Sequence, residues 1–249
     1  MLETKEPLIL ALETATRAGS VALARGDELL SAASGDASAS HSTDLIETVG
    51  SILNSGGAKL SEVDLFAAAV GPGSFTGLRI GLATIKSFAM CTGRTCAGVS
   101  TLAAIAHAAG NSEHTVALLP AGRGELFAQL FSVSGGQVRE SDTAAHLSPE
   151  AILEKYGMAP TLVWAGDGAH LQAESLRDWA RIKNFSFNEP DMNGIGWSLA
   201  PATGQLAVSI AALGLNAYRS RSTVSPNELR AVYVRASDAE INEKWQREK

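Results

Sequence analysis

The segment with the strongest chemical character is a glycine-rich loop between a predicted strand and a predicted helix. It reads Gly-Pro-Gly-Ser-Phe-Thr-Gly over residues 71–77. Glycines and a serine at the start of a helix expose backbone N–H groups that can bind an anion. The same residues also fit a tight strand-to-helix turn without a ligand. The loop is not a P-loop, because Leu78 stands where lysine is required, and Thr76 breaks the dinucleotide-binding spacing.

Polar residues also follow directly after the first predicted strand. The hydroxyls of Thr14 and Thr16 could face a phosphate, although threonine is equally typical of turns. Glu13 could hold a metal-bound water, and it fits a solvated turn residue as well. The candidates for a weak nucleotide or anion contact therefore come from two segments: Thr14, Thr16, Gly71, Gly73 and Ser74.

Other catalytic arrangements find no support in the sequence. A metal-binding helix face needs a second histidine four positions after the first, but Leu45 stands four positions after His41. The chain has no GxSxG elbow, and neither Cys91 nor Cys96 has a histidine nearby in sequence. We therefore predict no catalytic residue and no metal ligand in this chain.

Composition narrows the class of protein. The chain has 249 residues, of which 45% are apolar, and a net charge of −6, which predicts a folded chain that does not bind nucleic acid alone. A basic group near the C-terminus fits a solvated face better than an RNA site: Arg219, Arg221, Arg230 and Arg235. No apolar segment reaches the roughly 20 residues of a membrane helix, and the first six residues lack a signal-peptide pattern. Two cysteines make no disulfide framework, so we expect a cytoplasmic protein.

Strands and helices alternate around the glycine-rich loop. The predicted strands or extended segments are 8–12, 20–24, 28–33, 63–70, 115–119, 125–133, 137–143, 162–165 and 228–234. The predicted helices are 42–55, 76–92, 100–109, one opening at 148–150, 169–180 and 205–218, and segment 188–204 is predicted to be the least structured. The order meander, helix, strand, helix occurs twice, which predicts an α/β fold of two similar lobes. We expect a first lobe, a reduced second lobe, and a C-terminal helix and tail that pack on the first lobe: 1–106, 107–204 and 205–249.

The predicted helix over residues 76–92 is apolar around most of its circumference. Its only charged residues are Arg79 and Lys86, which share one stripe. A helix that is apolar all round is buried on more than one side. Because its own sheet covers one side, we expect a neighbouring helix or a partner subunit to cover the rest.

Several segments together resemble the TsaB (YeaZ) family. The most specific is VGPGSFTGLRIGL, and the supporting segments are spread along the chain: 8–23, 41–43, 98–102, 123–125 and 232–235. The resemblance implies the actin-like ATPase (ASKHA) fold, with a mixed five-stranded sheet flanked by helices in each lobe. It also implies a non-catalytic partner of TsaD, the enzyme that transfers a threonylcarbamoyl group to the adenosine next to the anticodon of tRNA.

The resemblance further implies how the chain associates. TsaB binds TsaD through two helices of each subunit, forms a homodimer through the same surface when alone, and joins the TsaE ATPase in a larger complex. The corresponding helices here are 42–55 and 76–92, and the implied interface residues are Leu45, Thr48, Ile52, Leu78, Arg79, Leu82, Ile85 and Lys86. We expect tRNA contact only through the complex and no membrane contact. No cofactor is required by this chain, and ATP or ADP is expected only at the complex interface.

The chain departs from the family pattern in two places. Residues 120–125 read Pro-Ala-Gly-Arg-Gly-Glu where relatives show Asp-Ala-Arg-Arg-Gly-Glu, and Glu13 stands where nucleotide-hydrolysing relatives of the fold use aspartate. Both departures lower the expectation of independent ATP binding, while Arg123 and Glu125 also fit an exposed hairpin pair. The alternative functions are an autonomous small-molecule kinase of the same fold, a metalloprotease-like enzyme that the missing ligand pair disfavours, and a homodimer with another structural task.

Overall fold

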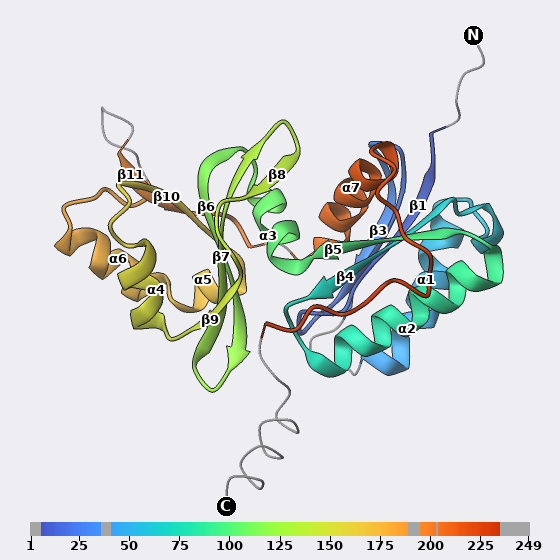
Figure 1. The fold of residues 1–249 in the computed structure, drawn as a ribbon, viewed down its shortest axis with the longest axis horizontal. Helices are drawn as coiled ribbons and strands as arrows, with labels where there is room; N and C mark the ends of the chain where they lie inside the picture. The colour runs from blue at the N-terminus through green and yellow to red at the C-terminus, as the bar shows by residue number, and fades with distance from the viewer. Residues whose placement is uncertain (1–5, 36–40, 189–194, 203, 235–249) are drawn as a thin grey trace, which may run out of the picture.

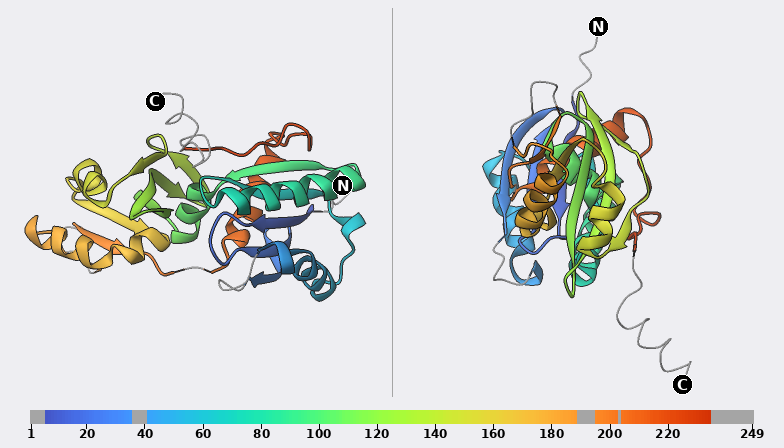
Figure 2. Two further views of the ribbon diagram at one scale, coloured as in Figure 1. Left: turned by 90° about the horizontal axis from the view of Figure 1, so that it is seen from below. Right: turned by 90° about the vertical axis from the view of Figure 1, so that its left-hand side faces the viewer.

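The computed structural model describes residues 6–35, 41–188, 195–202 and 204–234, without the side chains of residues 41–43. Two β-sheets, each with helices packed on it, lie side by side along the long axis of the molecule (Figure 1). Two further views show residues 220–234, drawn in red, running back along the first lobe toward the second (Figure 2). Within these described ranges no helix is both long enough and apolar enough to cross a membrane.

The first sheet is mixed and has five strands in the order β3-β2-β1-β4-β5. The strands are β1 (Leu8–Glu13), β2 (Ser20–Arg25), β3 (Glu28–Ser34), β4 (Leu65–Gly71) and β5 (Thr95–Ser100). β1 to β3 form an antiparallel meander, whereas β4 and β5 run parallel to β1. Every residue of β1 and β4 is buried, as expected for central strands that are covered on both faces.

Helices cover both faces of this sheet, and they are α1 (His41–Ser55), α2 (Phe75–Thr92) and α7 (Leu206–Arg219). Alternate side chains of β1 serve different cores, because successive side chains of a strand point to opposite faces. Ile9 and Ala11 belong to the cluster that includes α7. Leu10 and Leu12 belong to the cluster that includes α1 and α2.

The second sheet has six strands, five in the order β11-β10-β6-β7-β8 and a sixth, β9, beside β7. The strands are β6 (Ser112–Gly122), β7 (Glu125–Ser134), β8 (Gln137–Glu140), β9 (Ala145–Leu147), β10 (Thr161–Ala165) and β11 (Gly196–Leu199). One face packs against three helices, which are α4 (Pro149–Tyr156), α5 (Asp167–Leu171) and α6 (Ala173–Ile182). Trp164 and Trp197 meet edge to face in that core, with ring centroids 5.1 Å apart.

A single hydrophobic cluster joins the two lobes. α3 (Thr101–Ala109) and α7 pack against each other between the sheets. The cluster includes Ile9 of the first sheet, Ile105 of α3, Ile210 of α7 and Phe131 of the second sheet. The lobes therefore share part of their core.

The predicted two-lobed α/β architecture is confirmed, with three corrections. The second sheet has six strands instead of five, because β9 adds to its edge at β7. Three strands, β5, β9 and β11, were not predicted, because they are short or contain glycine and so lack a long apolar run. The helix predicted over 169–180 is two helices, α5 and α6, separated at Gln172. The division into 1–106, 107–204 and 205–249 stays a prediction, and its first boundary falls inside α3.

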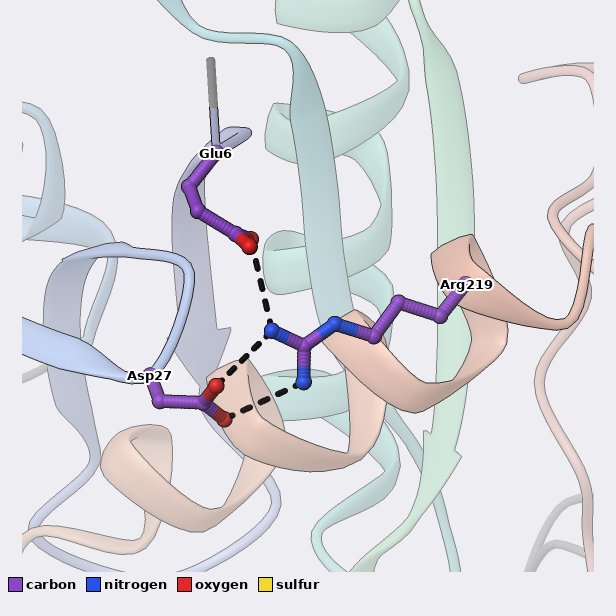
Figure 3. A network of polar contacts seen from close by, with 3 residues as sticks. All are labelled: Glu6, Asp27 and Arg219. Carbon is purple, nitrogen blue, oxygen red and sulfur yellow. Dashed lines mark hydrogen bonds and ion pairs between the residues drawn. The ribbon is translucent and has the colours of Figure 1, made fainter. Parts of the chain in front are cut away.

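Polar contacts fix α7 to the first sheet at both of its ends. At its start, the backbone N–H of Ala207 donates to Oγ of Ser20 at 3.0 Å. At its end, the Arg219 guanidinium bonds Asp27 at 2.7 Å and Glu6 at 3.3 Å (Figure 3). Arg219 is thus paired with two carboxylates, so this member of the C-terminal basic group serves the fold.

A histidine lies at the junction of α3 and α7. Nδ1 of His107 lies 3.0 Å from Oγ of Ser209, and burial lowers the pKa of the imidazole below its usual 6.5. The folded chain therefore holds this proton less tightly than the unfolded chain does. Its stability contribution is complete above pH 6.5 and falls as the pH drops below that value, because the unfolded state then takes up the proton first.

We expect His107→Gln to lessen the loss of stability on acidification. Urea unfolding at pH 7.5 and at pH 5.0 measures the effect, and the variant is expected to lose less stability between the two pH values than the parent chain. His114→Gln, at an exposed histidine, is the matched control and is expected to change the pH dependence less. Equal effects of the two substitutions would contradict the prediction.

Candidate functional site

The glycine-rich loop connects β4 to α2, and its serine caps the helix. Oγ of Ser74 accepts a hydrogen bond from the backbone N–H of Gly77 at 3.2 Å. The backbone N–H of Ser74 donates to the carbonyl of Ala15 at 2.8 Å. The loop is therefore joined directly to the turn between β1 and β2.

That turn is organised by Glu13, the last residue of β1. Its carboxylate accepts from the backbone N–H of Ala15 at 2.5 Å, from that of Thr16 at 2.7 Å and from the Thr16 hydroxyl at 2.5 Å. Glu13 is 1% exposed. From the sequence, Glu13 fitted a solvated turn residue or a holder of a metal-bound water, and its burial corrects the first of these expectations.

The glycines of the loop and of α2 allow a close approach of backbones. A Cβ on Gly77 would lie 1.9 Å from the carbonyl oxygen of Thr14, and one on Gly81 would lie 2.1 Å from Oγ1 of Thr14. A Cβ on Gly73 would lie 2.6 Å from the carbonyl oxygen of Ala15. These distances show that α2 lies directly on the turn, which explains the glycines without a ligand.

The structure brings the five candidate anion contacts into one region but does not leave them all open. Thr14 is 2% exposed and lies beneath α2, so the expectation that its hydroxyl faces a phosphate is wrong. The Thr16 hydroxyl donates to Glu13, and Gly71 packs against the carbonyl of Val232. Gly73 is half-buried against the turn, and Ser74 is exposed with its side chain capping α2.

Five of the eight implied interface residues are buried in the core of the chain itself: Leu45, Ile52, Leu78, Leu82 and Ile85. Leu78 and Ile85 are 0% exposed, so these side chains already pack against the chain's own sheet and cannot contact a partner. This corrects their expected role, because α2 has one face buried against its own sheet and an opposite face that is exposed. Thr48 is half-buried.

The outer face of α2 carries a line of exposed residues at helical spacing, which we name the α2 stripe: Thr76, Arg79, Ala83, Ser87 and Met90. Met90 is 57% exposed, and Ile46 of α1 is 61% exposed. Oγ of Ser87 donates to the carbonyl of Ala83 at 2.8 Å, so this hydroxyl is satisfied within its own helix. The stripe is therefore accessible along its length, with small side chains at Ala83 and Ser87 and the charged Arg79 near the start of the helix.

The two charged residues of α2 have different surroundings. The Arg79 guanidinium lies 3.8 Å from the centre of the Phe75 ring, which in turn lies 5.2 Å from the ring of Tyr233. Nζ of Lys86 donates to the carbonyl of Leu229 at 3.3 Å. The segment that contains Leu229 and Tyr233 thus runs along α2. We expected the tail to lie on the first lobe, but nothing local in the sequence indicated which helix it would contact.

Metal and nucleophile chemistry remain without a candidate in the described part of the chain. The described residues contain no group of three or more His, Cys, Asp or Glu side chains suited to a metal. The side chain of His41 lies outside the described residues. Burial raises the pKa of the Cys96 thiol to about 11, against the opposing charge of Lys86.

In the second lobe, Arg123 is exposed at a hairpin turn, and Oε2 of Glu125 lies 3.1 Å from Nε2 of His146.

Comparison with known proteins identifies the family. A family model described as "TsaD: tRNA N6-adenosine threonylcarbamoyltransferase" matches residues 34–237. The tRNA threonylcarbamoyladenosine biosynthesis protein TsaB of Escherichia coli (strain K12) is 33% identical over 151 residues, which are 59% of this chain and 65% of that protein. The protein of the same name from Haemophilus influenzae is 28% identical over 234 residues, which are 91% of this chain and 93% of that protein. The chain belongs to the TsaB (YeaZ) family.

A solved structure of a TsaB (YeaZ) relative agrees with the fold described above. YeaZ from Pseudomonas aeruginosa is 26% identical, with a TM-score of 0.72, and the match covers 91% of this chain and 99% of that one. The resemblance that the glycine-rich block predicted is confirmed, and so is the ASKHA-type fold. Of the residues in the α2 stripe, the resemblance had suggested only Arg79. A helical wheel of residues 76–92 could have indicated the others, because they lie opposite the most apolar side of the helix.

Proposed function

We propose that this chain is an accessory, non-catalytic subunit in the biosynthesis of threonylcarbamoyladenosine in tRNA, and that it binds and activates a TsaD-type transferase. The names of its relatives support the pathway. The observation that carries the partner role is the α2 stripe. Ala83 and Ser87 at the centre of the stripe have small side chains that let the helix of another protein approach closely. The exposed Met90 adds apolar area of the kind found at sites of protein association.

The chemistry of the first lobe supports a role without catalysis by this chain. An autonomous kinase would need an open phosphate site, but the backbone amides of the β1–β2 turn already bond to Glu13. The metalloprotease-like alternative would need a ligand cluster, which the described residues do not offer. We propose that no cofactor is required by this chain and that ATP or ADP binds only where the two subunits meet.

The remaining partners follow from the same role. We propose that TsaE joins the complex, that tRNA is reached only through it, and that the chain acts in the cytoplasm. The net charge of −6 supports indirect contact with tRNA. In the absence of TsaD, the α2 stripe would pair with that of a second copy, because isologous contacts need only one self-complementary surface.

Co-purification with the TsaD homologue of the same organism tests the proposal. We expect the two proteins to co-elute from a sizing column, and we expect threonylcarbamoyl transfer to tRNA only when both are present with the other components of the reaction. If the proteins neither associate nor depend on each other for activity, the proposal is wrong. A homodimer that persists beside free TsaD would favour the alternative of a separate structural task.

Ala83→Glu is expected to weaken the association with TsaD at least about tenfold, because it places a charge at the centre of the α2 stripe. The unfolding temperature of the isolated chain is expected to stay nearly unchanged, since Ala83 is exposed. Ala108→Glu makes the same change at an exposed alanine of α3 and is the matched control. Undiminished binding by the Ala83 variant, measured by calorimetric titration, would exclude the stripe as the interface.

A further inference from the structure

The carboxylate of Glu13 lies in a site built for an oxyanion. Two successive backbone N–H groups, of Ala15 and Thr16, and the Thr16 hydroxyl all donate to it at 2.5–2.7 Å. Adjacent amides that converge on one point form a concave anion site of the kind that holds phosphates. Here the anion is part of the chain, and it is 1% exposed.

The turn that contains this site contacts the start of α2 directly. With its N–H bonded to Glu13, Ala15 directs its carbonyl to the backbone N–H of Ser74, 2.8 Å away at the start of the helix. The adjacent residue, Thr14, lies so close to α2 that neither Gly77 nor Gly81 has room for a Cβ. A change in the shape of the turn must therefore move the first turns of α2.

Burial makes the carboxylate costly unless it is fully hydrogen-bonded. A buried charge without donors destabilises a fold, whereas charge-assisted hydrogen bonds are about twice as strong as neutral ones. The converse also holds, because without the carboxylate two amides would be left without their anion in a buried turn. The turn needs an oxyanion, whether internal or external.

We propose that the β1–β2 turn is an oxyanion-binding site that this chain fills with its own Glu13 carboxylate, which makes Glu13 the positioning residue for the start of α2. Because the carboxylate is attached to the chain, its effective concentration far exceeds that of a free anion in solution. The intact chain therefore gains nothing from added oxyanions. A chain without the Glu13 carboxylate accepts a small external one, such as formate, in the vacated space.

Glu13→Ala tests this inference by rescue with formate. The variant is expected to unfold at a lower temperature than the parent in sodium chloride, and equimolar sodium formate is expected to raise its unfolding temperature by at least about 3 °C. The parent chain and Glu28→Ala, which removes a carboxylate from an exposed position on β3, are expected to unfold at the same temperature in both salts. A folded Glu13→Ala variant with equal unfolding temperatures in chloride and formate would overturn the proposal.

Glu13→Gln provides a second measurement that does not depend on the alanine variant folding. It keeps the size of the side chain and removes its charge. The amide protons of Ala15 and Thr16 are expected to move upfield in the NMR spectrum and to exchange with solvent at least about tenfold faster, because their hydrogen bonds lose the charged acceptor. Amide resonances of the turn that match those of the parent chain would overturn the proposal. Since neither measurement involves TsaD, the inference stands or fails separately from the proposed function.

Discussion

Replacing Leu82 by glutamate is expected to destabilise the first lobe strongly. Leu82 is 7% exposed and belongs to the cluster that joins α1 and α2 to the sheet, together with Leu45 and Ile85. The substitution removes an apolar side chain from this core and leaves a charge without a partner, at a cost of roughly 4 kcal/mol in the free energy of unfolding. Urea unfolding followed by circular dichroism measures it.

The adjacent residue offers a control on the same helix. Ala83→Glu introduces the same charge one position along, on the exposed side of α2, and is expected to change the free energy of unfolding by less than about 0.5 kcal/mol. The two variants thus separate loss of folding from loss of association. An equally stable Leu82 variant would contradict the burial of this face of α2.

Gly77→Ala is expected to destabilise the chain although alanine favours helices. The new Cβ would lie 1.9 Å from the carbonyl oxygen of Thr14, which is backbone and cannot rotate away. The helix and the β1–β2 turn must then separate, and we expect a loss of about 3 kcal/mol in the free energy of unfolding. Because the turn orients α2, association with TsaD should weaken as well.

Gly50→Ala is the matched control, since Gly50 lies inside α1 and a Cβ there would meet nothing within 4 Å. Helix propensity alone then acts, and a gain of about 0.5–1 kcal/mol is expected. Opposite signs for the two glycines in thermal or urea unfolding would support the close contact of α2 with the turn. A gain at both positions would contradict it.

The parts of the fold that the sequence predicted are those with strong local signals. The apolar run over 8–12 and the helical pattern over 76–92 appear in the structure as β1 and α2. β5 escaped prediction because Gly98 interrupts it, and that glycine is explained only by distant residues. A Cβ there would lie 2.7 Å from Val70 and 3.0 Å from Leu229.

The sequence predicted correctly which segments of the chain lie together at the candidate site, but not which side chains are exposed there. The glycine-rich block and Thr14 do lie together, yet the reason is the contact between α2 and the turn. The sequence did not show that Leu78 and Ile85 are buried whereas Ala83 is exposed, because tertiary packing decides which side of a helix meets its own sheet. The role of Glu13 could not be predicted for a related reason. In sequence, a carboxylate that accepts hydrogen bonds from its own turn cannot be distinguished from any other acidic turn residue.

The position of α7 has a consequence for synthesis of the chain on the ribosome. The first sheet is complete in sequence by Ser100, but one of its faces is covered by a helix that ends at Arg219. Domains usually fold as units in order of their emergence, from the N-terminus onward. Here the apolar side chains of that face, such as Ile9 and Ala67, stay uncovered until the residues of α7, up to Arg219, have been made. The first lobe is therefore expected to complete its core only after the whole of the second lobe has been synthesised.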